Sequence, residues 1–497
     1  MKYISTRDPS IQLTASQAIL KGISPEGGLF VPEEFPQVDL DFIRELEGLT
    51  YWERAERVMA LYLDDFSRED LKACTEGAYR GTFDGDQPAP VRAAGDLRLL
   101  ELWHGPTCAF KDMALQMLPR LVSTARRNLG DDRRAIVLVA TSGDTGKAAL
   151  EGFRDVDGTG IAVFYPVDGV SQIQRLQMAT QQGSNVAVQA VEGNFDDCQT
   201  GVKHLFAKEQ LAERLGEQKM YLTSANSINW GRLLPQIVYY FSAYADLAAS
   251  GEIQVGDKLN VAVPTGNFGN ILACYYAKRM GLPVGKLICA SNRNDVLTDF
   301  LRTGIYDRNR PFHTTMSPSM DILISSNLER MLYYLSGKDS VKVAGWMKDL
   351  AEQGRYEVDA QTKEKIASLF LSASCDNAQT SAQIRSVYAR CGYVMDPHTA
   401  VGAHVLEQLK ERLDGKVTVL LSTASPYKFT RDVLKALGEA QEGLDDFACM
   451  RKLEQLSKQK IPAGLYALKD MPERFADVIS CEEMEEYVIA GAREILK

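Results

Sequence analysis

The sequence predicts an α/β fold whose strands are mostly parallel. Short apolar runs recur from residue 135 onward, and several of them are followed by a glycine-containing turn and then a helical pattern. Runs of this kind are typical of strands buried on both faces of a parallel sheet. Ligands of such sheets bind at the carboxyl ends of the strands, so we expect the turns there to carry the chemistry. The expected strands cover residues 135–140, 161–165, 186–191, 259–263, 287–290 and 417–421.

The chain divides into three expected parts. Its 497 residues, of which 45% are hydrophobic, suffice for more than one core. We expect an N-terminal domain at 1–95, a core of two α/β lobes at 96–440 and a C-terminal helical extension at 441–497. The smaller lobe of the core is expected at about 135–225.

The elements ahead of the first buried strand are mostly helical. Ser67 is a suitable N-cap for one of these helices, and Pro119 should kink or interrupt another. The expected helices cover residues 40–49, 50–63, 68–78 and 112–128, and two short strands are expected at 91–93 and 97–102.

The overall charge excludes two classes of partner. A formal net charge of -10 would repel nucleic acid and anionic membrane surfaces alike. Residues 1–8 show no apolar signal core, and no apolar run approaches the roughly 18 residues of a membrane span. Nine cysteines without a Cys-x-x-Cys pair predict reduced thiols, and five histidines without metal-ligand spacing predict no metal site. We therefore expect a cytoplasmic protein.

Lys111 is the first candidate for a catalytic group. It lies in the stretch 104–112, between small or apolar residues on one side and an aspartate that can start a helix on the other. An ammonium in a partly desolvated pocket has a lowered pKa, and the neutral amine can bond to an aldehyde cofactor or act as a base. The alternative is a surface lysine whose stem covers apolar neighbours.

The turn at 141–146 follows an expected strand and starts a helix. The hydroxyls of Thr141, Ser142 and Thr145 and the free N–H groups of a helix N-terminus favour an anion. The alternative is simple capping of the helix. A Walker A loop is excluded, because it requires glycine in place of Thr141 and serine or threonine in place of Ala148.

A second turn of this kind follows the strand expected at 259–263. Its glycines let the backbone wrap closely around a phosphate, and its two asparagines can donate hydrogen bonds. One such turn is weak evidence, whereas two in one chain indicate a ligand with phosphate groups. The turn consists of Gly266, Asn267, Phe268, Gly269 and Asn270.

Two further stretches contain suitable polar groups. Arg232, close in sequence to Asn226 and Ser227, offers bidentate recognition of phosphate or carboxylate, although a structural salt bridge is an alternative. The stretch 422–428 follows the last expected strand. A hydroxyl there can meet a ring nitrogen, or it can cap the next helix.

Together these motifs resemble the threonine synthase family, whose members are pyridoxal-phosphate enzymes of the tryptophan-synthase-β type of fold. The resemblance covers about the first 430 residues. The matching segments are 3–7, 27–32, 105–112, 141–146, 169–171 with 177–178, 226–232, 266–270, 396–402 and 422–429. The segment 27–32 is similar to threonine synthases in particular, and separates the chain from dehydratases that share the fold.

The resemblance implies fold type II of the pyridoxal-phosphate enzymes, with two α/β lobes and an added N-terminal helical domain. It further implies that Lys111 bonds covalently to the cofactor and that the turn at 266–270 binds the cofactor phosphate. Thr423 would face the pyridine nitrogen, and because a hydroxyl does not hold that nitrogen protonated, the ring should be a restrained electron sink. Asp144, where many relatives have asparagine, would lie near the 3-hydroxyl.

The resemblance also implies a substrate, O-phospho-L-homoserine, which water converts to L-threonine and phosphate. The residues that match substrate-binding positions are Thr141, Ser142, Thr145, Asn226, Ser227 and Arg232. Ser425 departs from the family, which often has histidine there. The alternatives are a dehydratase-like enzyme acting on a hydroxy amino acid and a relative that binds its ligand without catalysis. We expect a monomer or a homodimer.

Overall fold

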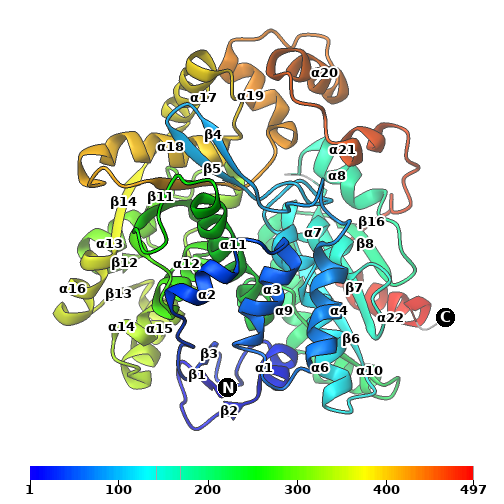
Figure 1. Ribbon diagram of the computed structural model, residues 1–497. Helices are drawn as coiled ribbons and strands as arrows, with labels where there is room; N and C mark the ends of the chain where they lie inside the picture. The colour runs from blue at the N-terminus through cyan, green and yellow to red at the C-terminus, as the bar shows by residue number, and fades with distance from the viewer. Residues whose placement is uncertain (142, 168–169, 496–497) are drawn as a thin grey trace.

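Two sheets with parallel strands organise the molecule. The computed structural model describes residues 1–141, 143–167 and 170–495. The larger sheet has six strands in the order β14-β11-β10-β15-β5-β4, and the smaller has five in the order β16-β8-β7-β6-β9. Figure 1 shows the smaller sheet on the right and the larger sheet at the upper left, with helices around both.

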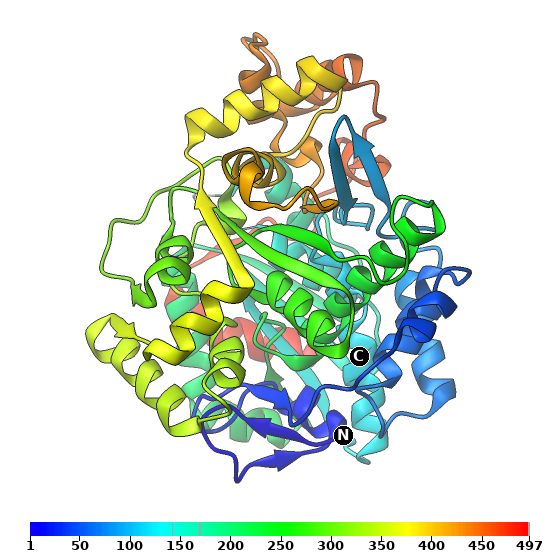
Figure 2. The ribbon, with the colours of Figure 1, turned by 60° about the vertical axis from the view of Figure 1, so that its left-hand side comes forward.

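The larger sheet confirms the strands expected in both halves of the chain. Its neighbours pair in parallel, except that β4 and β5 form an antiparallel hairpin. The boundary expected near residue 95 falls in the turn of that hairpin and stays a prediction. The strands are β4 (Val91–Ala94), β5 (Leu97–Glu101), β10 (Leu259–Pro264), β11 (Val284–Ser291), β14 (Phe370–Ser374) and β15 (Thr418–Ser422). Figure 2 gives a second view of this sheet.

The smaller sheet receives one strand from the C-terminal tail. Strand β16 pairs in parallel with β8, and the helix α22 (Met484–Ile495) packs on β7 and β8 through Met484, Val488 and Ile489. The expected extension is therefore helical with an added strand, and it is part of this sheet (Figure 1). The strands are β6 (Arg134–Ala140), β7 (Thr159–Pro166), β8 (Val186–Val191), β9 (Met220–Thr223) and β16 (Val478–Ile479).

The N-terminal region packs into the main core. Its antiparallel strands are in the order β2-β1-β3, and the ring of Tyr3 on β1 lies 5.2 Å from the ring of Trp230. The helices α2, α3 and α4 match the expected ones, whereas α1 was not predicted. The Ser67 side chain caps α4 by accepting from the backbone N–H of Asp70. The elements are β1 (Tyr3–Ser5), β2 (Gln12–Leu13), α1 (Ala15–Lys21), β3 (Phe30–Pro32), α2 (Leu40–Glu45), α3 (Tyr51–Ala60) and α4 (Arg68–Tyr79).

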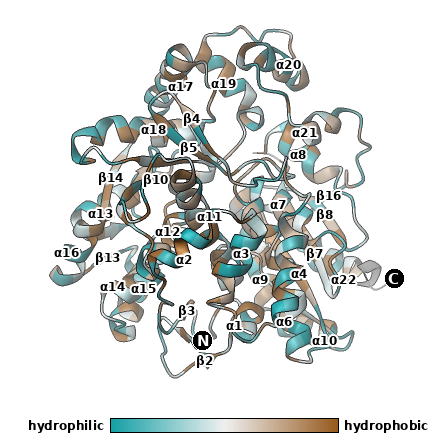
Figure 3. Ribbon diagram, viewed as in Figure 1, coloured by the Kyte–Doolittle hydropathy of each residue, from teal (hydrophilic) through white to brown (hydrophobic). Residues whose placement is uncertain are grey.

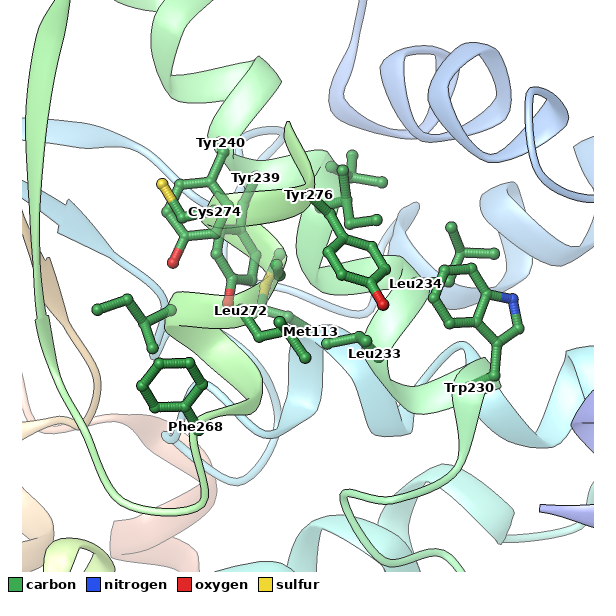
Figure 4. Packing of buried hydrophobic residues seen from close by; sticks show 14 of the residues in the cluster. Met113, Trp230, Leu233, Leu234, Tyr239, Tyr240, Phe268, Leu272, Cys274 and Tyr276 are labelled. Carbon is green, nitrogen blue, oxygen red and sulfur yellow. The ribbon is translucent and has the colours of Figure 1, made fainter. Parts of the chain in front are cut away.

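The helix α11 (Trp230–Ala249) lies at the centre of the largest core cluster. It packs against α12 (Gly269–Met280), and Figure 4 shows Tyr239 and Tyr240 of α11 beside Cys274 of α12. Apolar residues cover α11 all round, which is expected of a helix buried on every side. In Figure 3 the interior strand β10 has the hydrophobic colour, whereas outer helices such as α16 (Ala360–Leu369) are hydrophilic.

Across the described ranges, no helix combines the length and the apolar character that a bilayer crossing requires.

Further helices cover the sheets and connect their strands. The remaining elements are α8 (Gln172–Ala179), α9 (Phe195–Ala207), α10 (Glu209–Gly216), α13 (Val296–Thr303), β12 (Ile305–Asp307), α14 (Leu328–Leu335), α15 (Ser340–Gln353), β13 (Arg355–Glu357), α17 (Asn377–Cys391), α18 (Pro397–Leu409), η3 (Pro426–Phe429), α19 (Thr430–Leu437), α20 (Asp446–Ser457) and α21 (Ala463–Tyr466).

The helix expected at 112–128 is interrupted, as predicted. It forms α5 (Asp112–Leu115) and α6 (Leu118–Asn128), with Pro119 in the first turn of α6, where its missing N–H removes no helical hydrogen bond. The short α5 packs against α7 (Asp144–Phe153), which follows β6. Gly152 permits this contact, because a Cβ there would overlap the carbonyl oxygen of Leu115.

Gly152→Ala should destabilise the fold, since the added methyl group must displace the backbone of α5. Overpacking of this kind costs about 1–3 kcal/mol. Urea unfolding followed by circular dichroism should show a lower midpoint. Gly216→Ala is the matched control, because nothing lies within 4 Å of the position its Cβ would take. Equal midpoints for the two variants would contradict the packing argument.

Candidate active site

Lys111 lies between the carboxyl ends of β5 and β15. The backbone N–H of Phe110 donates to the carbonyl of Thr423 at 2.8 Å, and the N–H of Ser425 donates to the carbonyl of Cys108 at 3.0 Å. These bonds join the segment before Lys111 to the turn after β15. They place Lys111 beside Thr423, which is 5% exposed, and so bring together two of the predicted site residues.

The Lys111 ammonium is buried, with 8% of the residue exposed. Its Nζ donates to the Ser319 hydroxyl at 3.1 Å and lies 3.7 Å from Oδ2 of Asp144. Burial lowers the pKa of Lys111 to about 8; Asp144 opposes this effect, and the charges of Lys428 and Arg232 add to it. Part of the population therefore carries a neutral amine near neutral pH, as a nucleophile or base requires.

Asp144 starts α7 and connects several parts of the site. Its Oδ1 accepts from Nζ of Lys428 at 2.7 Å and from Nε2 of Gln174 at 3.0 Å. Burial opposes ionisation of this carboxyl, but Lys428 and Lys111 overcome that effect and hold the pKa of Asp144 well below its usual value. Asp144 is thus a permanent anion beside the Lys111 amine. Its expected place near the cofactor's 3-hydroxyl stays a prediction.

The turn at 266–270 connects β10 to α12 and contains an unpartnered donor. The Asn270 Oδ1 accepts from the hydroxyls of Tyr239 and Tyr240, at 2.5 and 2.6 Å, whereas its Nδ2 is buried without a partner in the described chain. Nδ2 of Asn327, whose backbone N–H donates to the Asn267 carbonyl, is also buried and unpartnered there.

Glycine shapes the surface of this turn. A Cβ at Gly266 would lie 2.6 Å from the carbonyl oxygen of Ser319, so the turn and the 3-10 helix η1 (Pro318–Met320) touch backbone to backbone. A Cβ at Gly269 would meet the amide nitrogens of Asn327 and Gln236, at 3.5 and 3.7 Å. Amide donors and the N-terminus of α12 converge on this space, so its chemistry fits a phosphate group.

Arg232 is a buried guanidinium at the start of α11. It is 6% exposed, and its Nη1 donates to the carbonyl of Ala225 at 2.6 Å. No carboxylate in the described ranges forms an ion pair with it, and burial lowers its pKa to about 10. Ser227 lies nearby, with its Oγ 3.3 Å from Oγ of Ser326. A buried guanidinium that lacks an anionic partner is suited to bind an anion that enters the site.

The other predicted substrate residues are not buried charged groups like Arg232. The Thr141 hydroxyl accepts from the N–H groups of Gly143 and Gly146, at 3.0 and 2.9 Å, so it already caps α7. Thr145 is half-buried in the first turn of that helix, and Ser142 lies outside the described residues. Asn226 is exposed. The substrate roles of these residues remain predictions.

The sequence reasoning assigned no role to three residues that complete the site. Ser319 accepts from Lys111, and its backbone N–H donates to Nε2 of His398 at 3.2 Å, while Asp396 lies 2.7 Å from Nδ1 of the same ring. Lys428 pairs with Asp144. His398 and Lys428 lie in segments that carry the resemblance, which was the available signal. Ser319 lies in the short 3-10 helix η1, in a stretch without periodic pattern, and no signal in the sequence identified it. The side chain of Ser425, a departure from the family, caps η3 by accepting from the N–H of Tyr427.

Family models cover most of the chain. The model of the threonine synthase N terminus matches residues 2–79, the model of pyridoxal-phosphate dependent enzymes matches 92–373, and the model of the threonine synthase C-terminal region matches 399–488. The likeness therefore extends beyond residue 430, where the sequence motifs had suggested that it ends.

Individual relatives agree with these models. Threonine synthase of Pseudomonas aeruginosa is 42% identical over 88% of this chain and 91% of its own length. Threonine synthase-like 1 of Homo sapiens is 41% identical, and the chain spans 64% of its length. The crystal structure of pyridoxal-phosphate-bound threonine synthase from Brucella melitensis has a TM-score of 0.88 at 38% identity, covering 99% of this chain and 100% of that one. The chain belongs to the threonine synthase family of pyridoxal-phosphate-dependent enzymes, and its cofactor is pyridoxal phosphate.

Proposed function

We propose that this chain converts O-phospho-L-homoserine and water to L-threonine and phosphate. The observation that carries the proposal is Arg232, a buried guanidinium without a carboxylate partner in the described ranges, whose charge acts on the Lys111 amine. A site for a second phosphate, separate from the turn at 266–270, suits a phosphorylated substrate. Serine and threonine carry only the α-carboxylate that every amino-acid substrate shares, and they offer no second anion for Arg232.

The residues of the site fit the cofactor. Lys111 would hold it covalently, the N–H groups and amides of 266–270 would bind its phosphate, and the Thr423 hydroxyl would face its ring nitrogen. Asp144 would lie near its 3-hydroxyl. When bound, the cofactor withdraws electrons from the amino-bearing carbon of the substrate and so acidifies the protons on Cα and then on Cβ.

The chain's own groups would manage the protons and the charge. The neutral Lys111 amine accepts the proton from Cα and, after giving that proton up, accepts the proton from Cβ, because it is the buried base beside the cofactor position. Arg232, with Asn226 and Ser227, binds the substrate phosphate and stabilises its charge as it leaves Cγ. The turn with Thr141, Ser142 and Thr145 binds the carboxylate. Burial of this site keeps stray water from the reacting carbons.

The wider assignments are also proposals. We propose the three-part division at residues 95 and 440, and a monomer or homodimer. A cytoplasmic location is supported by nine free cysteines, seven of them buried, since reduced thiols persist in the cytosol.

Substrate assays separate the three candidate functions. The purified chain, loaded with pyridoxal phosphate, should release phosphate from O-phospho-L-homoserine and form L-threonine in equal amounts. In parallel, it should form little keto acid from serine or threonine. Keto acid formation without phosphate release would indicate a dehydratase. Cofactor binding without either product would indicate a relative that only binds its ligand.

Arg232→Gln should weaken phosphohomoserine turnover by about 100-fold in kcat/KM, the loss expected when about 3 kcal/mol of charge-assisted hydrogen bonding is removed. Arg126→Gln is the matched control. Arg126 is also a buried arginine that donates to a backbone carbonyl, that of Asp131 at 3.2 Å. Steady-state kinetics should show normal values for the control. A normal kcat/KM in the Arg232 variant would rule out its role in substrate binding.

Gly269→Ala should weaken pyridoxal phosphate binding about tenfold, because its methyl group would fill space beside the Asn327 and Gln236 amides that suits the phosphate. The estimate corresponds to about 1.4 kcal/mol, one hydrogen bond lost. Absorbance titration of the cofactor-free chain gives the affinity. Gly345→Ala, in α15 with nothing within 4 Å of its Cβ, is the control. Unchanged affinity in the Gly269 variant would place the phosphate elsewhere.

A further inference from the structure

We propose that Lys428 is a positioning residue that keeps the Lys111 amine reactive by holding the carboxylate of Asp144. The inference rests on the proposed function for one point, the role of Lys111 as the cofactor's lysine. Its basis is the arrangement of two buried lysines around one buried carboxylate. Lys428 approaches Asp144 from η3, and Lys111 approaches it from the start of α5.

Lys428 is fixed by two strong contacts. Its side chain is 0% exposed, and its Nζ lies 2.7 Å from Oδ1 of Asp144. The same Nζ donates to the carbonyl oxygen of Thr107 at 2.9 Å. Thr107 precedes Lys111 by four residues, so Lys428 holds both the carboxylate and the segment that presents Lys111. Two of the three N–H groups of this fully buried ammonium are therefore taken up by fixed acceptors.

The contacts of Lys428 determine which carboxylate oxygen of Asp144 is available to Lys111. Oδ1 is occupied by Lys428 and Gln174. Oδ2 lies 3.7 Å from Nζ of Lys111, which is longer than a hydrogen bond. Nζ of Lys111 instead donates to the neutral hydroxyl of Ser319 at 3.1 Å. Lys428 therefore takes the full ion pair and leaves Lys111 with a weaker one.

The charges around Lys111 act in opposite directions. Asp144 on α7 stabilises the protonated amine, while Lys428 on η3 and Arg232 on α11 destabilise it. If the Lys428 cation were lost, its repulsion would disappear and Asp144 would be free to pair fully with Lys111. Both changes favour the ammonium form. An amine that keeps its proton can neither bond to an aldehyde nor accept a proton from a substrate carbon.

The competing interpretation is that Lys428 only neutralises a buried carboxylate and supports the fold. The two interpretations differ in one measurable property, the pH at which the Lys111 amine becomes reactive. A purely structural cation would leave that pH unchanged in any variant that still folds. A positioning cation would move it in a direction given by the charges.

The test is competitive labelling of the full-length, cofactor-free chain with a trace of acetic anhydride over about pH 6 to 10. Mass spectrometry of the peptide that contains Lys111 gives the midpoint of its reactivity. Lys428→Met should raise this midpoint by about one pH unit, the size expected from one nearby charge. Lys428→Arg, which keeps the cation, should stay near the wild-type value.

A charge-balanced variant keeps the test decisive if Lys428→Met folds poorly. The double variant Asp144→Asn with Lys428→Met removes the buried carboxylate together with its cation. It should return the midpoint of Lys111 labelling to the wild-type value or below. Lys147→Met is the matched control, because Lys147 is a buried lysine on α7. Its carboxylate partner, Glu151, would still form an ion pair with Arg154, whose Nη1 lies 2.8 Å from Oε1 of Glu151. Its labelling midpoint for Lys111 should be unchanged.

A midpoint in Lys428→Met that equals the wild-type value, or a midpoint in the charge-balanced variant that stays as high as in Lys428→Met, would overturn the inference. Labelling needs neither cofactor nor substrate, so it is independent of the proposed function. A shifted midpoint in a chain that releases no phosphate from phosphohomoserine would sink the function and leave the inference. Normal phosphate release with an unshifted midpoint would do the reverse.

Discussion

The buried carboxylate of Asp144 between two ammonium groups is the interaction on which the arrangement of the site depends. A charged carboxylate without partners is very costly to bury, and here Lys428, Gln174 and Lys111 supply them. These partners come from different parts of the fold. Asp144 and Gln174 follow strands of the smaller sheet, whereas Lys428 and Lys111 follow strands of the larger one. One charge cluster thus links the two sheets at the proposed cofactor position.

Local sequence patterns predicted many of the sheet strands and several helices, because these elements depend mainly on neighbouring residues. The buried strands, the cap at Ser67 and the interruption at Pro119 are examples. Strand β16 could not be predicted in this way, since two residues become a strand only by pairing with β8, almost 300 positions earlier. The antiparallel pair of β12 and β13 likewise depends on a partner distant in sequence.

The site residues likewise divide into those that local patterns indicated and those that depend on the fold. The small and apolar neighbours of Lys111 indicated that residue, and a turn at a strand end indicated the stretch 266–270, because ligands of parallel sheets bind at the carboxyl ends of the strands. The roles of the other site residues depend on their burial, which a sequence does not reveal without its fold. It distinguishes Arg232, which has no anionic partner in the described chain, from the exposed Asn226, although both lie in one motif. It also separates Lys428, locked between Asp144 and the Thr107 carbonyl, from an ordinary surface lysine.

The central claim is that Lys111 alone, among the buried lysines near Asp144, is free to bond to the cofactor. Borohydride reduction makes the cofactor's bond to a lysine permanent, and peptide mass spectrometry then identifies that lysine. The cofactor-loaded chain should carry the label on Lys111 and none on Lys428 or Lys147. Label on Lys428 would contradict the account, because it would require the ion pair with Asp144 to be open when the cofactor binds.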